Sequence, residues 1–108
     1  MANLNPKKSG LPVIIWSDHS GVSRKIRHNE PRVKIGKNDH WAEISISDKP
    51  KILSHSSDIK KSEMDDIQKG IEYVARNYDI FLKHFYDTDY EFDDEALFNA
   101  LRERGEYR

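Results

Sequence analysis

The hydrophobic pattern of this chain changes its period once, close to Ser62, and this change restricts the folds open to it. Before that point apolar residues alternate with polar ones in short runs, which is typical of strands with one buried face. After it they recur every three or four positions, which is typical of an amphipathic helix. With 108 residues the chain has room for one hydrophobic core. The pattern therefore predicts an α+β domain: a small antiparallel sheet of three to four strands packed against one long amphipathic helix.

Three stretches before Ser62 indicate strands. Residues 12–16 form a β-branched apolar run, and residues 31–36 and 41–47 alternate on either side of the turn-forming segment 36–39. Two alternating runs joined by a short Gly/Asn/Asp connection favour a β-hairpin. A short edge strand over 50–54 and a weak strand over 22–26 are further candidates. Residues 1–10 are expected to be a flexible lead, and residues 11–108 a single domain.

The helical stripe extends over residues 62–87. Its apolar members share one helical face: Met64, Ile67, Ile71, Val74, Tyr78, Phe81 and Phe85. The aromatic members are bulky for the knobs-into-holes contacts of a coiled coil, so packing on the sheet is preferred to a dimer seam. A short second helix is expected over 93–104, with an acidic first turn and a basic last turn. Residues 88–108 would thus form an acidic, helical C-terminal extension.

Composition excludes several classes of site. Cysteine is absent, which excludes disulfides, thiolate catalysis and Cys-ligated zinc. No apolar run approaches the roughly 20 residues of a membrane span, and no N-terminal segment resembles a signal peptide, so a cytoplasmic location without membrane contact is expected. The histidines lack metal-ligand spacing, and the common hydrolase and phosphate-binding motifs are missing. We therefore expect a protein that is not an enzyme and needs no metal or cofactor.

Charge is divided between the two halves of the chain. The formal net charge is only −1, yet residues 1–61 carry a net charge of +6 and residues 62–108 a net charge of −7. The division coincides with the change from strand period to helix period. Each half is therefore a candidate binding surface of its own sign.

The acidic half contains a dense run of carboxylates interleaved with aromatic side chains. A connecting loop and an acidic first helical turn account for only part of this run. A surface that docks a basic protein partner accounts for all of it, because tyrosine and phenylalanine supply much of the buried area at interfaces. The predicted protein-binding residues are Asp87, Asp89, Tyr90, Glu91, Phe92, Asp93, Asp94 and Glu95.

The basic half offers an alternative surface for nucleic acid. Arg32 and Lys34 alternate with apolar residues and so share the solvent face of one strand, where Trp41 could supply a stacking surface. Lysine and arginine on an exposed strand also discourage edge-to-edge aggregation, which is the structural explanation. The candidate nucleic-acid-binding residues are Arg24, Lys25, Arg27, Arg32, Lys34 and Lys37.

The segment 28–31 (His-Asn-Glu-Pro), the hairpin after it and the long helix together resemble an uncharacterised bacterial small-protein family, one of the domain-of-unknown-function families. The resemblance covers roughly residues 12–87. Such proteins are often encoded beside another small protein and described as toxin–antitoxin-like, which implies a protein partner. The family often has histidines after the proline, where this chain has Arg32 and Lys34, so histidine-centred chemistry is not implied here. Residues beyond 88 lie outside the resemblance.

Three hypotheses follow. The preferred one is a regulatory or inhibitory module that binds a protein with a basic surface, either a toxin–antitoxin partner or a nucleic-acid enzyme blocked in the manner of phage-encoded inhibitors, anti-CRISPR proteins included. The alternative is a nucleic-acid-binding module that uses the basic sheet. The third is a homodimer in which the oppositely charged halves attract head to tail.

Overall fold

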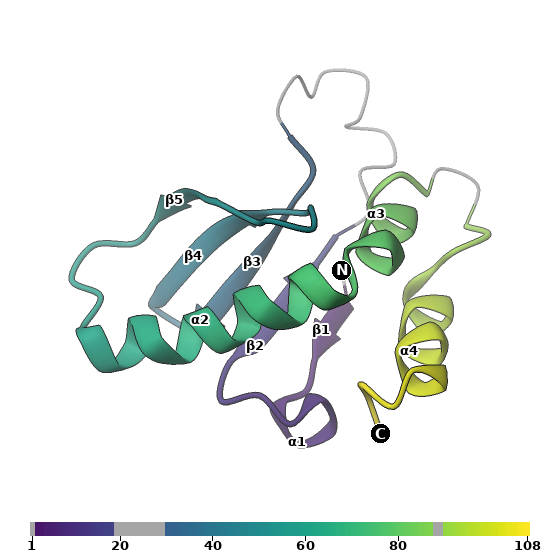
Figure 1. Ribbon diagram of the computed structural model, residues 1–108, viewed down its shortest axis with the longest axis horizontal. Helices are drawn as coiled ribbons and strands as arrows, with labels where there is room; N and C mark the ends of the chain where they lie inside the picture. Colours follow the sequence, from purple (N-terminus) through teal and green to yellow (C-terminus); the bar gives the residue numbers. More distant parts are fainter. Residues whose placement is uncertain (1, 19–29, 88–89) are drawn as a thin grey trace.

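Five strands form one antiparallel sheet in which sequence neighbours are also spatial neighbours (Figure 1). The computed structural model describes residues 2–18, 30–87 and 90–108. The strands are β1 (Ala2–Leu4), β2 (Ile14–Ser17), β3 (Arg32–Lys37), β4 (His40–Ser45) and β5 (Ile52–His55). The α+β class predicted from the sequence is confirmed, with five strands where three or four were expected. The weak strand expected over 22–26 lies outside the described residues.

The additional strand comes from the segment expected to be a flexible lead, and that expectation was wrong for residues 2–9. Ala2 and Leu4 are 1% and 0% exposed, because β1 pairs with β2 along the edge of the sheet. A short helix follows, α1 (Pro6–Ser9), capped by the Asn5 side chain, which accepts a hydrogen bond of 2.8 Å from the backbone N–H of Lys7. Three strand residues are too few to show an alternating pattern, so only the pairing identifies them.

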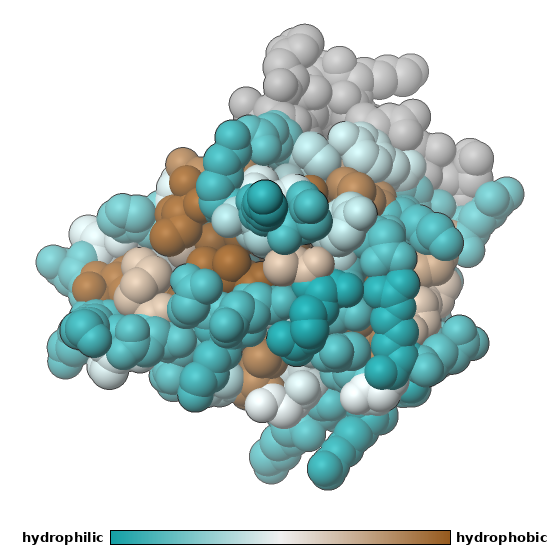
Figure 2. Space-filling view, in the orientation of Figure 1, coloured by the Kyte–Doolittle hydropathy of each residue, from teal (hydrophilic) through white to brown (hydrophobic). Residues whose placement is uncertain are grey.

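The hydrophobic core lies between one face of the sheet and three further helices. Alternate strand residues point into it, among them Ile15, Ile35 and Ile44, each 0% exposed. The helix α2 (Lys61–Arg76) crosses this face, and a Cβ built on its Gly70 would lie 2.6 Å from Ile35 Cγ2. Glycine here lets α2 approach β3 closely. Figure 2 shows hydrophilic side chains along the outward side of α2, as its amphipathic sequence requires.

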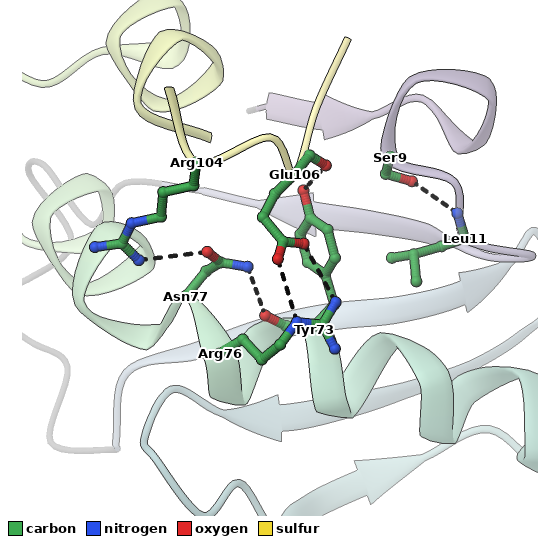
Figure 3. Close-up of polar contacts among 7 residues, drawn as sticks. All are labelled: Ser9, Leu11, Tyr73, Arg76, Asn77, Arg104 and Glu106. Carbon is green, nitrogen blue, oxygen red and sulfur yellow. Dashed lines mark hydrogen bonds and ion pairs between the residues drawn. The ribbon is translucent and has the colours of Figure 1, made fainter. Parts of the chain in front are cut away.

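The single long helix expected over 62–87 is broken in two. After α2 a second helix begins at once, α3 (Tyr78–Phe85), and Asn77 lies between them with φ −121° and ψ 23°. The Asn77 side chain is buried, and its amide donates a 3.0 Å hydrogen bond to the Tyr73 carbonyl oxygen (Figure 3). The break shifts the buried stripe: Ile80, Phe81 and Phe85 face the core, whereas Tyr78, a member of the predicted stripe, is 38% exposed.

The C-terminal segment is part of the core. The helix α4 (Asp94–Glu103) packs against α3, and its Leu97 and Leu101 are both 0% exposed. The chain then turns back over the junction of α2 and α3, where the Tyr73 hydroxyl donates a 2.7 Å hydrogen bond to the Glu106 carbonyl oxygen (Figure 3). The sequence predicted that residues 88–108 form an extension, but their described part completes the helical layer. None of the helices in the described ranges is long and apolar enough to cross a bilayer.

An exposed ion pair joins α3 to the end of α4, and it makes a pH-dependent prediction. The Arg104 guanidinium donates two hydrogen bonds to the Asp79 carboxylate, which holds the pKa of Asp79 below its ordinary 3.8. A lowered folded-state pKa stabilises the protein above the ordinary pKa, and this stabilisation is lost as the pH falls through the folded value. Because the pair is exposed, its contribution should be at most about 1 kcal/mol.

We expect Arg104→Gln to return the pKa of Asp79 toward 3.8, measured by carboxyl ¹³C NMR titration. Glu63, in the first turn of α2, is the control because it lies far from Arg104. A hydrogen bond from His40 is the chief cause of its lowered pKa, which should stay low in the same spectra. An Asp79 titration curve identical in both proteins would show that Arg104 does not cause the shift.

Candidate functional site

The face of the sheet turned away from α2 carries two tryptophans and a set of charged side chains. Strand alternation places them there, and the register aligns Trp16, Lys34, Glu43 and Ser54 in one row across β2, β3, β4 and β5. Trp41 lies two residues before Glu43 on β4, opposite Gly36 and on the same face of the sheet. We call this surface the tryptophan face and define it by Trp16, Arg32, Lys34, Trp41 and Glu43.

Lys34 occupies the centre of the tryptophan face. Its Nζ atom lies 5.2 Å from the ring centroid of Trp16 and 5.0 Å from that of Trp41, so the ammonium group interacts with both rings. A cation–π contact of this kind is worth about 0.5–1 kcal/mol at an exposed site. The structure records no ion pair between Lys34 and a carboxylate in the described part of the chain. The lysine charge is therefore balanced by ring faces rather than by an anion.

Glu43, the carboxylate of the tryptophan face, already has two partners on the sheet. Glu43 accepts a 2.6 Å hydrogen bond from the Ser54 hydroxyl and lies 3.5 Å from the Arg32 guanidinium. The Arg32 and Glu43 side chains are 22% and 32% exposed, so both remain accessible at their outer atoms. Beside them is an open hollow of about 440 Å³. Its described lining consists of Trp16, Asp18, Arg32, Val33, Lys34, Asn38, Glu43 and Phe85.

The other predicted nucleic-acid residues do not join this face in the described structure. Lys37 lies at the opposite side of the hairpin, where its Nζ is 4.0 Å from Asp66 of α2. Close to it His40 pairs with Glu63, which ties the hairpin to the first turn of α2. Arg24, Lys25 and Arg27 lie outside the described residues. Of the three candidates within the described residues, Arg32 and Lys34 are therefore the pair that the fold brings together.

Several carboxylates of the acidic run have roles inside the molecule. Asp87 is 8% exposed, and its Oδ1 accepts a 3.0 Å hydrogen bond from the backbone N–H of Glu91. Asp93 caps α4 by accepting a 3.0 Å hydrogen bond from the backbone N–H of Ala96. Asp94 lies 2.8 Å from the His84 ring. All three residues, which the sequence predicted to bind a partner, have contacts that organise the turn between α3 and α4, and burial makes Asp87 unsuited to binding a partner.

The rest of the acidic run has a more accessible surface. Tyr90 is 73% exposed, and Tyr86, just before the run, is 46% exposed. Phe92 is partly buried against the core beneath the Lys83 ammonium, and Glu95 lies 3.8 Å from Arg102. Asp89 lies outside the described residues. What remains outward-facing is a tyrosine-rich patch edged by Glu91 and Glu95.

A serine, a histidine and an aspartate form a chain of hydrogen bonds between β2, α3 and α4; the first two are buried, and the aspartate side chain is 40% exposed. Ser17 Oγ is 2.9 Å from His84 Nδ1, and His84 Nε2 is 2.8 Å from Asp94 Oδ1. The Asp94 carboxylate only accepts, so Nε2 carries a proton. Ser17 and His84 are both 0% exposed, so the hydroxyl is out of reach of a substrate in solution. We interpret the three residues as a polar link that ties the helical layer to the sheet.

No group of three or more His, Cys, Asp or Glu side chains suited to a metal ion occurs within residues 2–18, 30–87 and 90–108. His40, His55 and His84, the described histidines, lie apart: His40 pairs with Glu63, and His55 contacts the backbone carbonyl of Ser56. The described histidines therefore serve local contacts.

Trp16 and Glu43 are the members of the tryptophan face that the sequence analysis did not single out, and Trp16 is the more informative of the two. It ends the apolar run over residues 12–16, in which no polar residue marks an outward face. In the structure Val13 and Ile15 are buried, while Ile14 and Trp16 point to the other face. Every second residue of the run points outward, but alternation is recognised from polar residues between apolar ones, and this run has none.

Comparison with known proteins gave no match: no protein-family model, no curated protein and no solved structure is similar to this chain. The resemblance to a toxin–antitoxin-like family therefore stays a prediction.

Proposed function

We propose that this protein is a non-enzymatic module that binds nucleic acid through the tryptophan face. The observation that carries the proposal is the Lys34 ammonium, which lies 5.2 Å and 5.0 Å from the centroids of two tryptophan rings on the sheet face turned away from α2. Proteins that bind single strands combine cationic side chains for the phosphates with aromatic rings for the bases. Here both kinds of group share one surface, together with the Arg32 guanidinium.

Charge supports this face over the acidic run. Glu43 is engaged by Arg32 and Ser54, whereas Lys34 has no carboxylate partner among the described residues, so its ammonium group is available to an incoming phosphate. The carboxylates of the helical half lie on other elements, and they would repel nucleic acid from the rest of the surface. A chain with a net charge of −1 can therefore bind a polyanion, but in one orientation.

The proposal is tested with Lys34→Gln and Arg32→Gln in a fluorescence-anisotropy titration of labelled RNA and DNA oligonucleotides at several salt concentrations. We expect the wild type to bind with an affinity that falls as salt rises. Each substitution should weaken binding by about tenfold and reduce the salt dependence by about one phosphate contact. Lys37→Gln, which removes a lysine from the opposite side of the hairpin, is the matched control and should bind as the wild type does.

A wild type that forms no salt-dependent complex with either oligonucleotide would refute nucleic-acid binding. Equal losses in Lys34→Gln and Lys37→Gln would refute the assignment to the tryptophan face.

A second candidate function is docking of a basic protein, such as a toxin–antitoxin partner or a nucleic-acid enzyme, on the tyrosine-rich patch. The observation that favours it is the exposure of Tyr90, 73%, beside Glu91. The informative variant is Glu91→Lys with Tyr90→Ala, because Asp93 and Asp94 have structural contacts whose loss would obscure the result. A cognate partner that binds this double variant as well as the wild type would exclude the patch.

A further inference from the structure

The two tryptophans of the tryptophan face lie on strands that flank the strand of Lys34. Trp16 is on β2 and Trp41 on β4, with β3 between them. Two strand spacings amount to about 10 Å. The ammonium group is 5.2 Å and 5.0 Å from the two centroids, so one cation contacts both rings and the centroids are at most about 10 Å apart. The surface thus has two flat apolar platforms separated by one positive charge.

We infer that the ligand of this face is an unpaired strand, with one base stacked on each tryptophan and the phosphate between those bases held by Lys34. The inference rests on the proposed function and specifies its ligand. Bases of a duplex follow one another at 3.4 Å along each strand and cover one another's faces. The faces of duplex bases are therefore closed to the two rings, whereas an unstacked strand can place one base on each of them.

The position of the positive charge also assigns a binding site to the phosphate that links the two bases. The linker between two bases that occupy separate platforms passes through the space between the platforms, which is where Lys34 lies. In the free protein the ammonium contacts the rings. On binding, the bases take over the ring faces and the phosphate takes over the ammonium, so each group exchanges a weak partner for a stronger one.

The recognition expected from this arrangement tolerates different sequences. Stacking uses the π-face that every base has, and a lysine binds a phosphate without regard to the base attached. The ligand class is therefore single-stranded RNA or DNA, read through its backbone charge and its uncovered bases.

The chain offers a direct probe, because its two tryptophans are both on this face. Tryptophan emission is followed while the full chain is titrated with a thymidine oligonucleotide, a uridine oligonucleotide and a blunt duplex of equal length. We expect both single strands to quench the emission to saturation and the duplex to leave it nearly unchanged over the same range.

Substitutions then separate stacking from folding, with binding followed by anisotropy of the labelled strand. Trp16→Leu and Trp41→Leu keep an apolar side chain but remove the π-face, and each should weaken single-strand binding by about tenfold or more, the effect of losing one stacked base. Trp16→Phe and Trp41→Phe should stay within about threefold of the wild type, because a smaller ring still stacks. Tyr78→Leu, at a 38% exposed aromatic on α3, is the control and should not change the affinity.

The outcomes distinguish this inference from the function on which it rests. Equal binding of duplex and single strand, lost in Lys34→Gln but kept in both leucine variants, overturns the inference and leaves nucleic-acid binding in place. Absence of any complex overturns both. Single-strand binding that both leucine variants weaken and both phenylalanine variants keep supports both.

Discussion

Removal of residues 88–108 should abolish cooperative folding of the remaining chain. Leu97 and Leu101 of α4 are fully buried, and Tyr107 is 7% exposed, so the deletion would uncover the core side of α3. Truncation of one such leucine to alanine costs about 2–5 kcal/mol, against a total stability of about 5–15 kcal/mol for a typical domain. The deletion also takes away Asp94 and Glu106, which hydrogen-bond to His84 and Tyr73. The expected result is the absence of a sigmoidal urea transition by circular dichroism.

A milder variant keeps this prediction quantitative. Leu97→Ala in the full chain should lower the free energy of unfolding by about 2–5 kcal/mol without changing the slope of the urea dependence. Glu103→Ala, at an exposed position of the same helix, is the matched control and should change it by less than about 0.5 kcal/mol. If the chain without residues 88–108 still unfolds cooperatively and gives a dispersed NMR spectrum, the segment is not needed for folding and the prediction is wrong.

Replacement of His84 by alanine should lower the free energy of unfolding by about 3 kcal/mol, because it combines a cavity with broken buried hydrogen bonds. The ring is 0% exposed and lies between Ser17 of β2 and Asp94 of α4. Without it the Ser17 hydroxyl, also 0% exposed, loses its ring partner, and the helical layer loses a polar contact with the sheet. Urea denaturation near neutral pH measures the change.

His55→Ala is the control for loss of a histidine as such, since His55 is exposed on β5. It should change the free energy of unfolding by less than about 0.5 kcal/mol. Should His84→Ala be as stable as His55→Ala, the line of Ser17, His84 and Asp94 would contribute nothing to folding, and a role in chemistry would have to be considered for it instead.

The acidic run shows how tertiary contacts account for carboxylates that composition alone leaves unexplained. Six carboxylates in nine residues appeared to exceed what local structure needs. In the fold, Asp87 binds a turn backbone, Asp93 caps a helix and Asp94 meets a histidine ten residues earlier in the chain. The cap follows from local sequence. The other two contacts depend on how the chain turns between α3 and α4, which short-range patterns do not encode.

The α+β class, the hairpin of β3 and β4 and the two amphipathic segments follow from the sequence alone, because the period of apolar residues reports which faces are buried. Even the outward position of Arg32 and Lys34 follows from alternation. Tertiary structure alone decided the rest: it paired β1 with β2, broke the helix at Asn77 and buried α4. It also set Trp16 and Trp41 on either side of Lys34, because strand order and register determine which side chains of separate strands become neighbours, and no local pattern records them.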